Sequence, residues 1–213
     1  MVRGYKTVQT SGGTCDAGRH SRPNSRRHLR TLPEAGHDRP GLKQIAQSAG
    51  APFGSIYHFF PGGKAQLADE AIRAAGAMYR DLVLAIFDQD GPDLAATIRT
   101  AFAAAADNLI ATDYTDACPI ATIALEVAST DEALRHATAE VFTDWIEQGA
   151  ERIADTGLPP STRRRLMLGF ITSLEGAFVL SRALRDPEPL FAAGETVAAA
   201  VTSALATAAT QTE

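Results

Sequence analysis

The residues best suited to chemistry lie in one stretch, from Ile45 to Leu67, which reads IAQSAGAPFGSIYHFFPGGKAQL. Within it, Tyr57 offers a hydroxyl, His58 an imidazole N–H and Lys64 a positive charge. These groups donate hydrogen bonds to phosphate oxygens, which is how proteins position themselves on a nucleic-acid backbone. The stretch therefore indicates recognition of a polyanion rather than bond-making chemistry.

Two short helices joined by a tight turn would present these side chains. Apolar residues recur at helical spacing before Gly50 and again from Phe53 to Phe60, and Gly50 breaks the first helix. Pro52 suits the first turn of the second helix because its missing N–H loses no bond there, and Pro61 ends that helix. In DNA readers of this geometry the second helix enters the major groove and the first braces it. Many helical proteins contain similar hairpins, so the spacing alone leaves a purely structural role open.

Other kinds of chemistry fit the sequence less well. The run Gly62-Gly63-Lys64 lacks the distant glycine and the following Ser or Thr of a phosphate-binding loop. No nucleophile is accompanied by a plausible base, and no spacing of His, Cys, Asp and Glu is typical of a metal site. Three acids lie on apolar helices, and we interpret them as ordinary surface or core acids in preference to polar pocket residues or catalytic acids: Glu126, Glu140 and Glu175. We therefore expect no enzyme activity, no cofactor and no metal.

Composition is that of a globular intracellular protein. The chain has 213 residues, of which 45 % are hydrophobic, enough for one large domain or two small ones. It begins without the apolar core of a secretory signal, and no charge-free apolar run reaches the length of a membrane span. The two cysteines, Cys15 and Cys118, lie far apart in unlike surroundings and form no disulfide framework. These features predict a cytoplasmic protein without a membrane segment.

Charge is unevenly distributed along the chain. Residues 1–40 carry eight Lys and Arg against three acids, whereas the whole chain has a net charge of −5. A basic front and an acidic rear indicate an anionic partner for the front, or a tail whose arginines have no role. Residues 1–40 are also rich in Gly, Pro and Ser and poor in apolar residues, so we expect this segment to be disordered.

The remainder of the sequence reads as helices throughout. Apolar residues follow helical spacing in every segment, and no stretch has the alternation of a strand. The expected helices after the helix–turn–helix cover about residues 64–88, 93–111, 118–128, 131–156, 161–186 and 189–208. Thr130 or Asp131, and Ser161, are the expected caps of two of them. The apolar side of the helix at 64–88 is expected to hold Leu67, Ala71, Ala74, Met78, Leu82 and Ile86. The fold class predicted is all-α.

The helix–turn–helix stretch and the residues next to it resemble the DNA-binding region of the TetR family of one-component repressors. The resemblance covers GLKQIAQSAGAPFGSIYHFFPGGKAQLADEAI without a gap. Three later runs, ACPIATIALEVA, FTDWIEQGAERIADTGL and LEGAFVLSRALRDPEPL, are similar to the ligand-binding domain of the LmrA/YxaF-like branch. The resemblance spans about residues 41–205. It implies a helix-turn-helix DNA-binding domain at 41–75, followed by a helical ligand-binding and dimerisation domain at 76–208.

The resemblance also implies roles for particular residues. It implies a homodimer that binds operator DNA and is released when a small-molecule effector enters the helical domain. The DNA-binding positions would be Lys43, Pro52, Phe53, Gly54, Ser55, Tyr57, His58 and Lys64. The ligand-binding candidates are Phe102, Cys118, Ile120, Ile123, Phe142 and Trp145, each of which could equally be ordinary core. The dimer interface candidates, on the last two long helices, are Leu166, Phe170, Leu174, Phe178 and Val197.

The sequence departs from the family upstream of about Leu42. Family members begin with an amphipathic first helix, whereas residues 1–40 are an atypical basic segment with Pro33 inside the expected helix and Pro40 at its expected cap. We hypothesise that these residues come from a shifted reading frame, which translation of the same DNA in its other two frames would test. The alternative function is a helical small-molecule-binding dimer that has lost DNA binding because its first helix is missing.

Overall fold

The computed structural model describes residues 58–89, 93–115, 117–127 and 129–210. The chain divides into two units, residues 1–41 and 42–213, and all of the described residues belong to the second. Within them every regular element is helical, which confirms the all-α fold class. The elements are α3 (Gly63–Gln89), α4 (Leu94–Ala111), α5 (Pro119–Val127), α6 (Glu132–Arg152), the short 3₁₀ helix η1 (Ala154–Thr156), α7 (Pro160–Leu184) and α8 (Glu188–Thr210).

Capping side chains fix several of the helix ends. The Asp93 carboxylate accepts hydrogen bonds from the backbone N–H groups of Ala95 and Ala96, at 3.0 and 3.1 Å, and so begins α4. The Asp131 carboxylate begins α6 in the same way, as expected. The prediction that Ser161 caps α7 is wrong, because that helix begins at Pro160 with Pro159 at the cap position. A proline at the first helical position has no N–H to satisfy, so the helix starts there without a polar cap.

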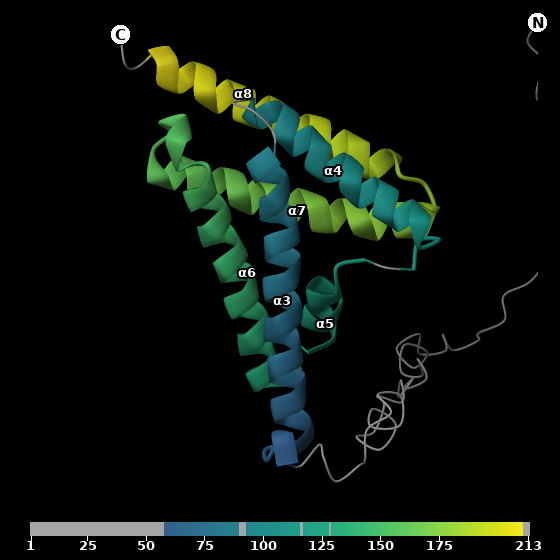
Figure 1. Ribbon diagram of the computed structural model, residues 1–213. Helices are drawn as coiled ribbons and strands as arrows, with labels where there is room; N and C mark the ends of the chain where they lie inside the picture. The colour runs from purple at the N-terminus through teal and green to yellow at the C-terminus, as the bar shows by residue number, and fades with distance from the viewer. Residues whose placement is uncertain (1–57, 90–92, 116, 128, 211–213) are drawn as a thin grey trace, which may run out of the picture. The chain divides into compact units, whose positions relative to one another are not determined.

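Helices α3 and α6 run side by side (Figure 1). Helix α5 packs against α6. They approach closely at Gly76, where an added Cβ would lie 2.5 Å from a Val141 methyl carbon. At the same place the Trp145 indole Nε1 donates a 2.8 Å hydrogen bond to the Gly76 carbonyl oxygen. A core cluster centred on Ile72, Cys118, Ile120, Ala137 and Val141 fills the space between these three helices.

The larger core cluster lies among α4, α7 and α8 (Figure 1). Its centre is Phe102, whose ring packs edge-on against Phe170 with the centroids 5.3 Å apart. Gly194 on α8 lies directly over Phe102, since a Cβ there would come within 2.9 Å of the Phe102 Cβ. Because glycine has no Cβ, α8 can lie close along α4 at this position, and the apolar sides of both helices are buried.

The buried face of α3 differs from the expected one. Met78 and Leu82 are 61 % and 64 % exposed, whereas Ile72 is only 3 % exposed. Ala71 and Ala74 are exposed too, and of the predicted set only Ile86 packs against a core cluster. The reason is the close contact at Gly76, which turns the side of α3 that carries Ile72 and Gly76 toward α6. Periodicity identified the helix correctly, but α3 carries apolar residues on more than one side.

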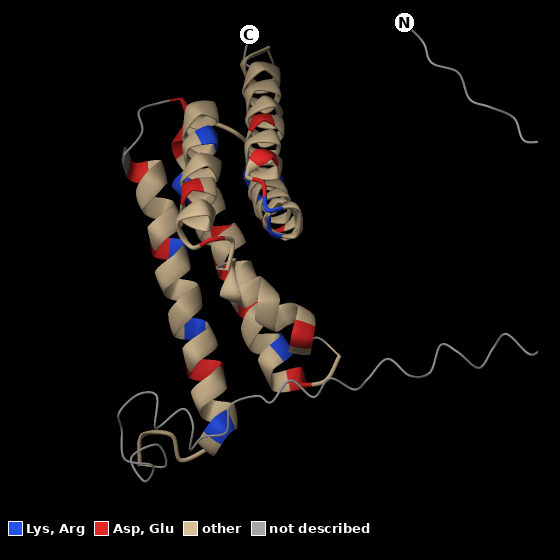
Figure 2. Ribbon diagram, turned by 90° about the vertical axis from the view of Figure 1, so that its right-hand side faces the viewer, with Lys and Arg blue, Asp and Glu red and all other residues tan. Residues whose placement is uncertain are grey.

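Helices α7 and α8 leave apolar side chains on the surface. Exposed on them are Leu168, Val179, Leu180, Leu184 and Phe191. By length and composition alone both helices could cross a membrane, and only 28 % of each apolar window is buried within the chain. Helix α8 contains two acids and no basic residue, and it is largely uncharged where it leads to the C-terminus in Figure 2. Interior helices of soluble proteins meet the same criterion, and a second copy of the chain would cover such a face equally well.

Candidate functional site

The residues expected to touch DNA fall mostly outside the described part of the chain. Lys43, Pro52, Phe53, Gly54, Ser55 and Tyr57 lie there, so the structure does not test their roles. The two that are described, His58 and Lys64, are both exposed. Between them Phe59 is 68 % exposed and its ring contacts His58 edge-on, with the centroids 5.1 Å apart.

A tight turn connects these two side chains. The Gly63 N–H donates a 2.8 Å hydrogen bond to the Phe60 carbonyl oxygen, and Gly63 adopts a φ of 67°, which a glycine tolerates best. The Gln66 side chain accepts a 2.8 Å bond from the Gly62 N–H. Lys64 therefore lies in the first turn of α3, where its exposed charge adds to the positive end of the helix dipole. An anion such as a phosphate is favoured at such a helix start.

A cleft of about 290 Å³ lies between α5, the residues before it, and α7. Its lining is mostly apolar, from Ala117, Cys118, Ala121, Leu125, Phe178 and Val179. The polar residues in the lining are Thr122, Glu126, Glu175 and Arg182. An apolar concavity with a few polar groups is the usual form of a small-molecule site, and this volume is near the small end of the range for such sites.

Of the two acids that line the cleft, Glu175 lies in apolar surroundings. Burial raises the pKa of the Glu175 carboxyl, and its interaction with the Cys118 thiol offsets part of that change. Burial, together with the negative charge of Glu175, raises the pKa of the Cys118 thiol to about 12. The Cys118 Sγ also accepts a 3.4 Å hydrogen bond from the Ala121 N–H. At neutral pH the thiol is therefore protonated, and a protonated thiol is a poor nucleophile.

The cation in the cleft is already engaged elsewhere. The Arg182 Nε donates a 3.1 Å hydrogen bond to the Tyr114 carbonyl oxygen, in the loop after α4. Tyr114 also receives the Arg185 guanidinium over its ring, at 5.4 Å from the centroid. Glu126, on the α5 side of the cleft, is exposed. The cleft thus presents one sheltered carboxylate, one exposed carboxylate and one guanidinium that braces a loop.

Five of the six ligand candidates named from the sequence are brought together. Cys118, Ile120, Ile123, Phe142 and Trp145 all belong to the smaller core cluster. Only Cys118 among them lines the cleft, and the others form the packed layer behind it. The Trp145 indole N–H is satisfied by a backbone carbonyl rather than directed toward open space. Phe102 lies apart from the other five, in the larger cluster against Phe170.

Several lining residues were not among the named ligand candidates. Ala117, Ala121 and Thr122 are small, and Leu125, Val179 and Arg182 are exposed on the chain, so neither type is marked by apolar periodicity. Two of the three acids considered as pocket groups, Glu126 and Glu175, do line the cleft. The third, Glu140, is on the surface and bonded to Arg73 of α3. A carboxylate on an otherwise apolar helix was the useful sequence signal for Glu175.

The five residues expected at a dimer interface are all at least partly buried within the chain. Leu166, Phe170 and Val197 are buried, and Leu174 and Phe178 pack partly buried against the same core cluster. Phe178 also lines the cleft.

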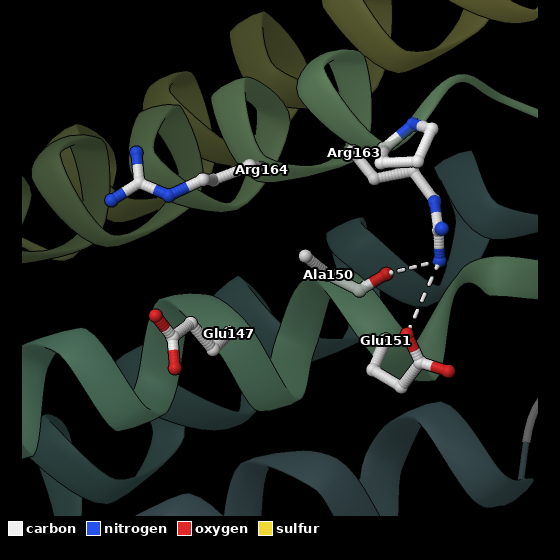
Figure 3. A pocket seen from close by; sticks show the side chains of 6 residues that line it. Glu147, Ala150, Glu151, Arg163 and Arg164 are labelled. Carbon is white, nitrogen blue, oxygen red and sulfur yellow. Dashed lines mark hydrogen bonds and ion pairs between the residues drawn. The ribbon is translucent and has the colours of Figure 1, made fainter.

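A second, shallower hollow of about 170 Å³ lies where α6 meets the start of α7 (Figure 3). The Arg163 Nη1 donates a 3.0 Å hydrogen bond to the Ala150 carbonyl oxygen and lies 3.7 Å from a Glu151 carboxylate oxygen (Figure 3). Arg164 points away from this contact. Arg164 and Arg165 are exposed, whereas Arg163 ties α7 to the end of α6.

Comparison with known protein families identifies the second half of this fold. The family described as Transcriptional regulator LmrA/YxaF-like, C-terminal domain, matches residues 95–196. An HTH-type transcriptional regulator of Mycobacterium tuberculosis is 33 % identical over 164 residues, covering 74 % of this chain and 81 % of that protein. The HTH-type regulator YxaF of Bacillus subtilis is 30 % identical over 162 residues, covering 76 % and 84 %. LmrA of the same organism is 29 % identical over 150 residues, covering 70 % and 79 %.

Solved structures share the fold at lower sequence identity. The regulatory protein TetR from Rhodobacter sphaeroides superimposes with a TM-score of 0.64 at 21 % identity, covering 78 % of this chain and 90 % of that one. A TetR transcriptional regulator from Legionella pneumophila gives a TM-score of 0.57 at 19 % identity, covering 76 % and 87 %. These similarities are evidence of a common fold.

Proposed function

Because this chain belongs to the TetR family of HTH-type transcriptional regulators, in its LmrA/YxaF-like branch, we propose that it is a ligand-responsive repressor in the cytoplasm. It binds operator DNA as a homodimer and leaves the operator when a small molecule enters the helical domain. The observation that supports this most strongly is the match to HTH-type regulators over about three quarters of the chain. Enzyme activity is no part of the proposal, since the relatives of the chain are transcriptional regulators.

The DNA-facing end of the proposal is supported by His58 and Lys64. Both side chains are exposed next to the tight turn at Gly63. Phe59, between them, is exposed too, so a large partner such as a DNA duplex can reach this surface. Their donors suit phosphate oxygens, while base reading is assigned to the front of the preceding helix, at Pro52, Phe53, Gly54 and Ser55. Tyr57, and Lys43 on the bracing helix, are proposed as further phosphate contacts.

The ligand end is supported by the cleft between α5 and α7. Cys118 lines it, and Trp145 lies in the packed layer behind it and is hydrogen-bonded to α3. A guest in the cleft would press on the cluster that α3, α5 and α6 share. Since α3 begins at the turn that carries Lys64, a shift of α3 would move the DNA-facing residues of each subunit.

The homodimer is proposed to form through the outer faces of α7 and α8. The exposed apolar residues there are Leu168, Val179, Leu180, Leu184 and Phe191. Gly169 and Gly176 have open space where a Cβ would stand, which permits close approach of a second helix pair. Val179 belongs both to this face and to the lining of the cleft. Ligand occupancy and subunit arrangement would therefore affect each other.

Binding to the DNA upstream of the protein's own coding sequence tests the proposed function. A gel-shift titration of the full chain should give a specific complex that weakens steeply as salt rises, because phosphate contacts release counterions. The alternative, a ligand-binding dimer without DNA binding, is favoured by the atypical composition of residues 1–40, where the family has an apolar helix. A folded dimer that shows no specific shift at low salt would support that alternative.

A further inference from the structure

We propose that the cleft between α5 and α7 selects ligands with an apolar body and a hydrogen-bond-donating head, an ammonium group above all, which the Glu175 carboxylate receives. This inference deepens the proposed function and rests on its premise that a small molecule acts on the helical domain. It assigns the chemical class of the ligand from the arrangement of three charged groups in the cleft.

The charges in the lining favour a cation over an anion. Glu126 and Glu175 contribute two carboxylates, and Arg182 contributes the one guanidinium among the residues that line the cleft. Arg182 is turned toward the Tyr114 carbonyl oxygen by its Nε–H, so part of its donor capacity is already used. An anionic head placed beside Glu175 would meet a like charge in apolar surroundings, where repulsion is weakly screened.

Glu175 lacks a cationic partner within the described part of the chain. Its carboxylate appears in none of the described ion pairs, and the polar group that interacts with it is the Cys118 thiol. A carboxylate sheltered among apolar residues is disfavoured in its charged form unless it is paired or hydrogen-bonded. An ammonium ion that entered the cleft would supply both a charge partner and hydrogen-bond donors. The burial that raises the pKa of Glu175 is thus compensated by the ligand.

The neighbouring Cys118 thiol does not bind the ligand covalently. The pKa of Cys118 is raised to about 12, so the thiolate that would attack an electrophile is scarcely populated at neutral pH. Binding is therefore reversible and non-covalent. The apolar lining from Ala121, Leu125 and Phe178 receives the body of the ligand, and the cleft of about 290 Å³ limits that body to roughly one ring with a short chain.

The test uses three probes of matched shape on the full-length protein. These are 4-phenylbutylamine, 4-phenylbutanol and 4-phenylbutyrate, which carry a cationic, a neutral and an anionic head on the same body. Isothermal titration calorimetry should rank them amine, alcohol, carboxylate, with the amine about tenfold tighter than the alcohol, since a charge-assisted bond contributes more than a neutral one. A carboxylate that binds as well as the amine, or no binding by any of the three, would overturn the proposal.

Two conservative variants locate the effect. Glu175→Gln keeps the size of the side chain and should bring the amine down to the affinity of the alcohol, while the alcohol is unaffected. Glu126→Gln, at the exposed side of the cleft, should change the amine by no more than about threefold because solvent screens it. Thermal melting of both variants checks that they fold. An amine preference that survives Glu175→Gln in a folded protein contradicts the assignment.

Failure of this proposal can be separated from failure of the proposed function. If the chain forms a specific operator complex but the amine does not bind, the repressor account stands and the ligand class is wrong. If the amine binds through Glu175 but no operator complex forms, the ligand class stands and the DNA-binding role is lost. Release of operator DNA by the amine, and not by the carboxylate, would support both.

Discussion

The Trp145 indole Nε1 donates a 2.8 Å hydrogen bond to the carbonyl oxygen of Gly76, which joins the middle of α6 to the middle of α3. The Trp145 ring also packs edge-on against Phe142, with the centroids 5.5 Å apart. Helix α3 starts at the turn next to Lys64, and α6 contributes to the core cluster behind the cleft. One side chain therefore links the layer that would sense a ligand to the helix that leads toward DNA.

Replacing Trp145 by Phe should weaken this link while keeping an aromatic ring in the cluster. The substitution removes the indole donor and some volume, so we expect a loss of about 1–3 kcal/mol in the free energy of unfolding. Urea unfolding followed by circular dichroism measures it, because the variant lacks the protein's one tryptophan. A variant as stable as the parent chain would show that the bond contributes nothing net.

Gly76→Ala should be more damaging than an ordinary helix glycine replacement. Its Cβ would stand 2.5 Å from a Val141 methyl carbon, so α3 and α6 must separate, at a cost of about 1–3 kcal/mol for overpacking. Gly149→Ala on α6 is the matched control, since the atom nearest to its added Cβ is the Met167 sulfur at 2.8 Å, at the end of a flexible side chain that can move aside, so its loss should be smaller. The double variant Gly76→Ala, Val141→Ala should recover part of the loss. Equal melting temperatures for the two single variants would contradict the close contact.

Phe102 should behave as a core residue rather than a ligand contact. Its side chain is buried against Phe170 and Gly194, away from the cleft, so Phe102→Leu should lower the free energy of unfolding by about 1–3 kcal/mol. Affinity for 4-phenylbutylamine should remain within about twofold of the parent value. A large loss of affinity without a loss of stability would restore Phe102 as a ligand residue.

Leu180→Glu should dissociate the proposed homodimer. Leu180 is exposed on the outer face of α7, and a charge there would be buried against a second copy at a cost of several kcal/mol. Sedimentation velocity should show the monomer at concentrations where the parent chain is a dimer. Leu82→Glu makes the same change at an exposed position on α3 and should leave the dimer intact. The interface assignment fails if the two variants sediment alike.

Lys64→Gln should weaken operator binding by a similar factor on all sequences. Its charge is exposed at the start of α3 and is assigned to a phosphate, so its loss from both subunits of the homodimer should reduce the slope of log affinity against log salt by about two. Fluorescence anisotropy with operator and with unrelated duplexes at several salt concentrations measures both effects. An unchanged slope would remove Lys64 from the interface.

The helix boundaries were the part of the fold that sequence patterns predicted best. Asp93, Asp131 and Gly157 mark ends through local chemistry, two as side-chain caps and one through its φ of 73°, and each acts without help from distant residues. Ser161 failed because Pro159 and Pro160 begin the helix first. Local rules succeed wherever the determining atoms are close in sequence.

Which face a helix buries was harder to predict, because that depends on partners far away in the chain. Met78 and Leu82 have the spacing of a core stripe, yet the contact of Gly76 with Val141 turns them outward. Likewise the apolar residues of α7 divide between the core and the outer face, and Leu166 and Phe170, expected at a dimer interface, are buried within the chain. Apolarity indicates that a residue will be covered, but not whether its own chain or a second copy covers it.

The cleft was predicted only in part. Glu175 was one of three acids noted on apolar helices and Cys118 was one of the ligand candidates, but the alanines at 117 and 121 carry no signal of their own. A cleft forms where side chains leave the space between two elements unfilled, so small side chains contribute to it as much as large ones. Only the packing of α5 beside α7 brings those positions together.

Operator binding by the full-length dimer, measured with and without ligand, tests the central claim most directly. A labelled duplex from the protein's own upstream region should give a specific anisotropy increase at moderate salt that an unrelated duplex does not. Added 4-phenylbutylamine should reverse the increase in the parent chain but not in Glu175→Gln. A folded dimer that binds both duplexes equally, or neither of them at low salt, would contradict the account of this chain as a ligand-responsive repressor.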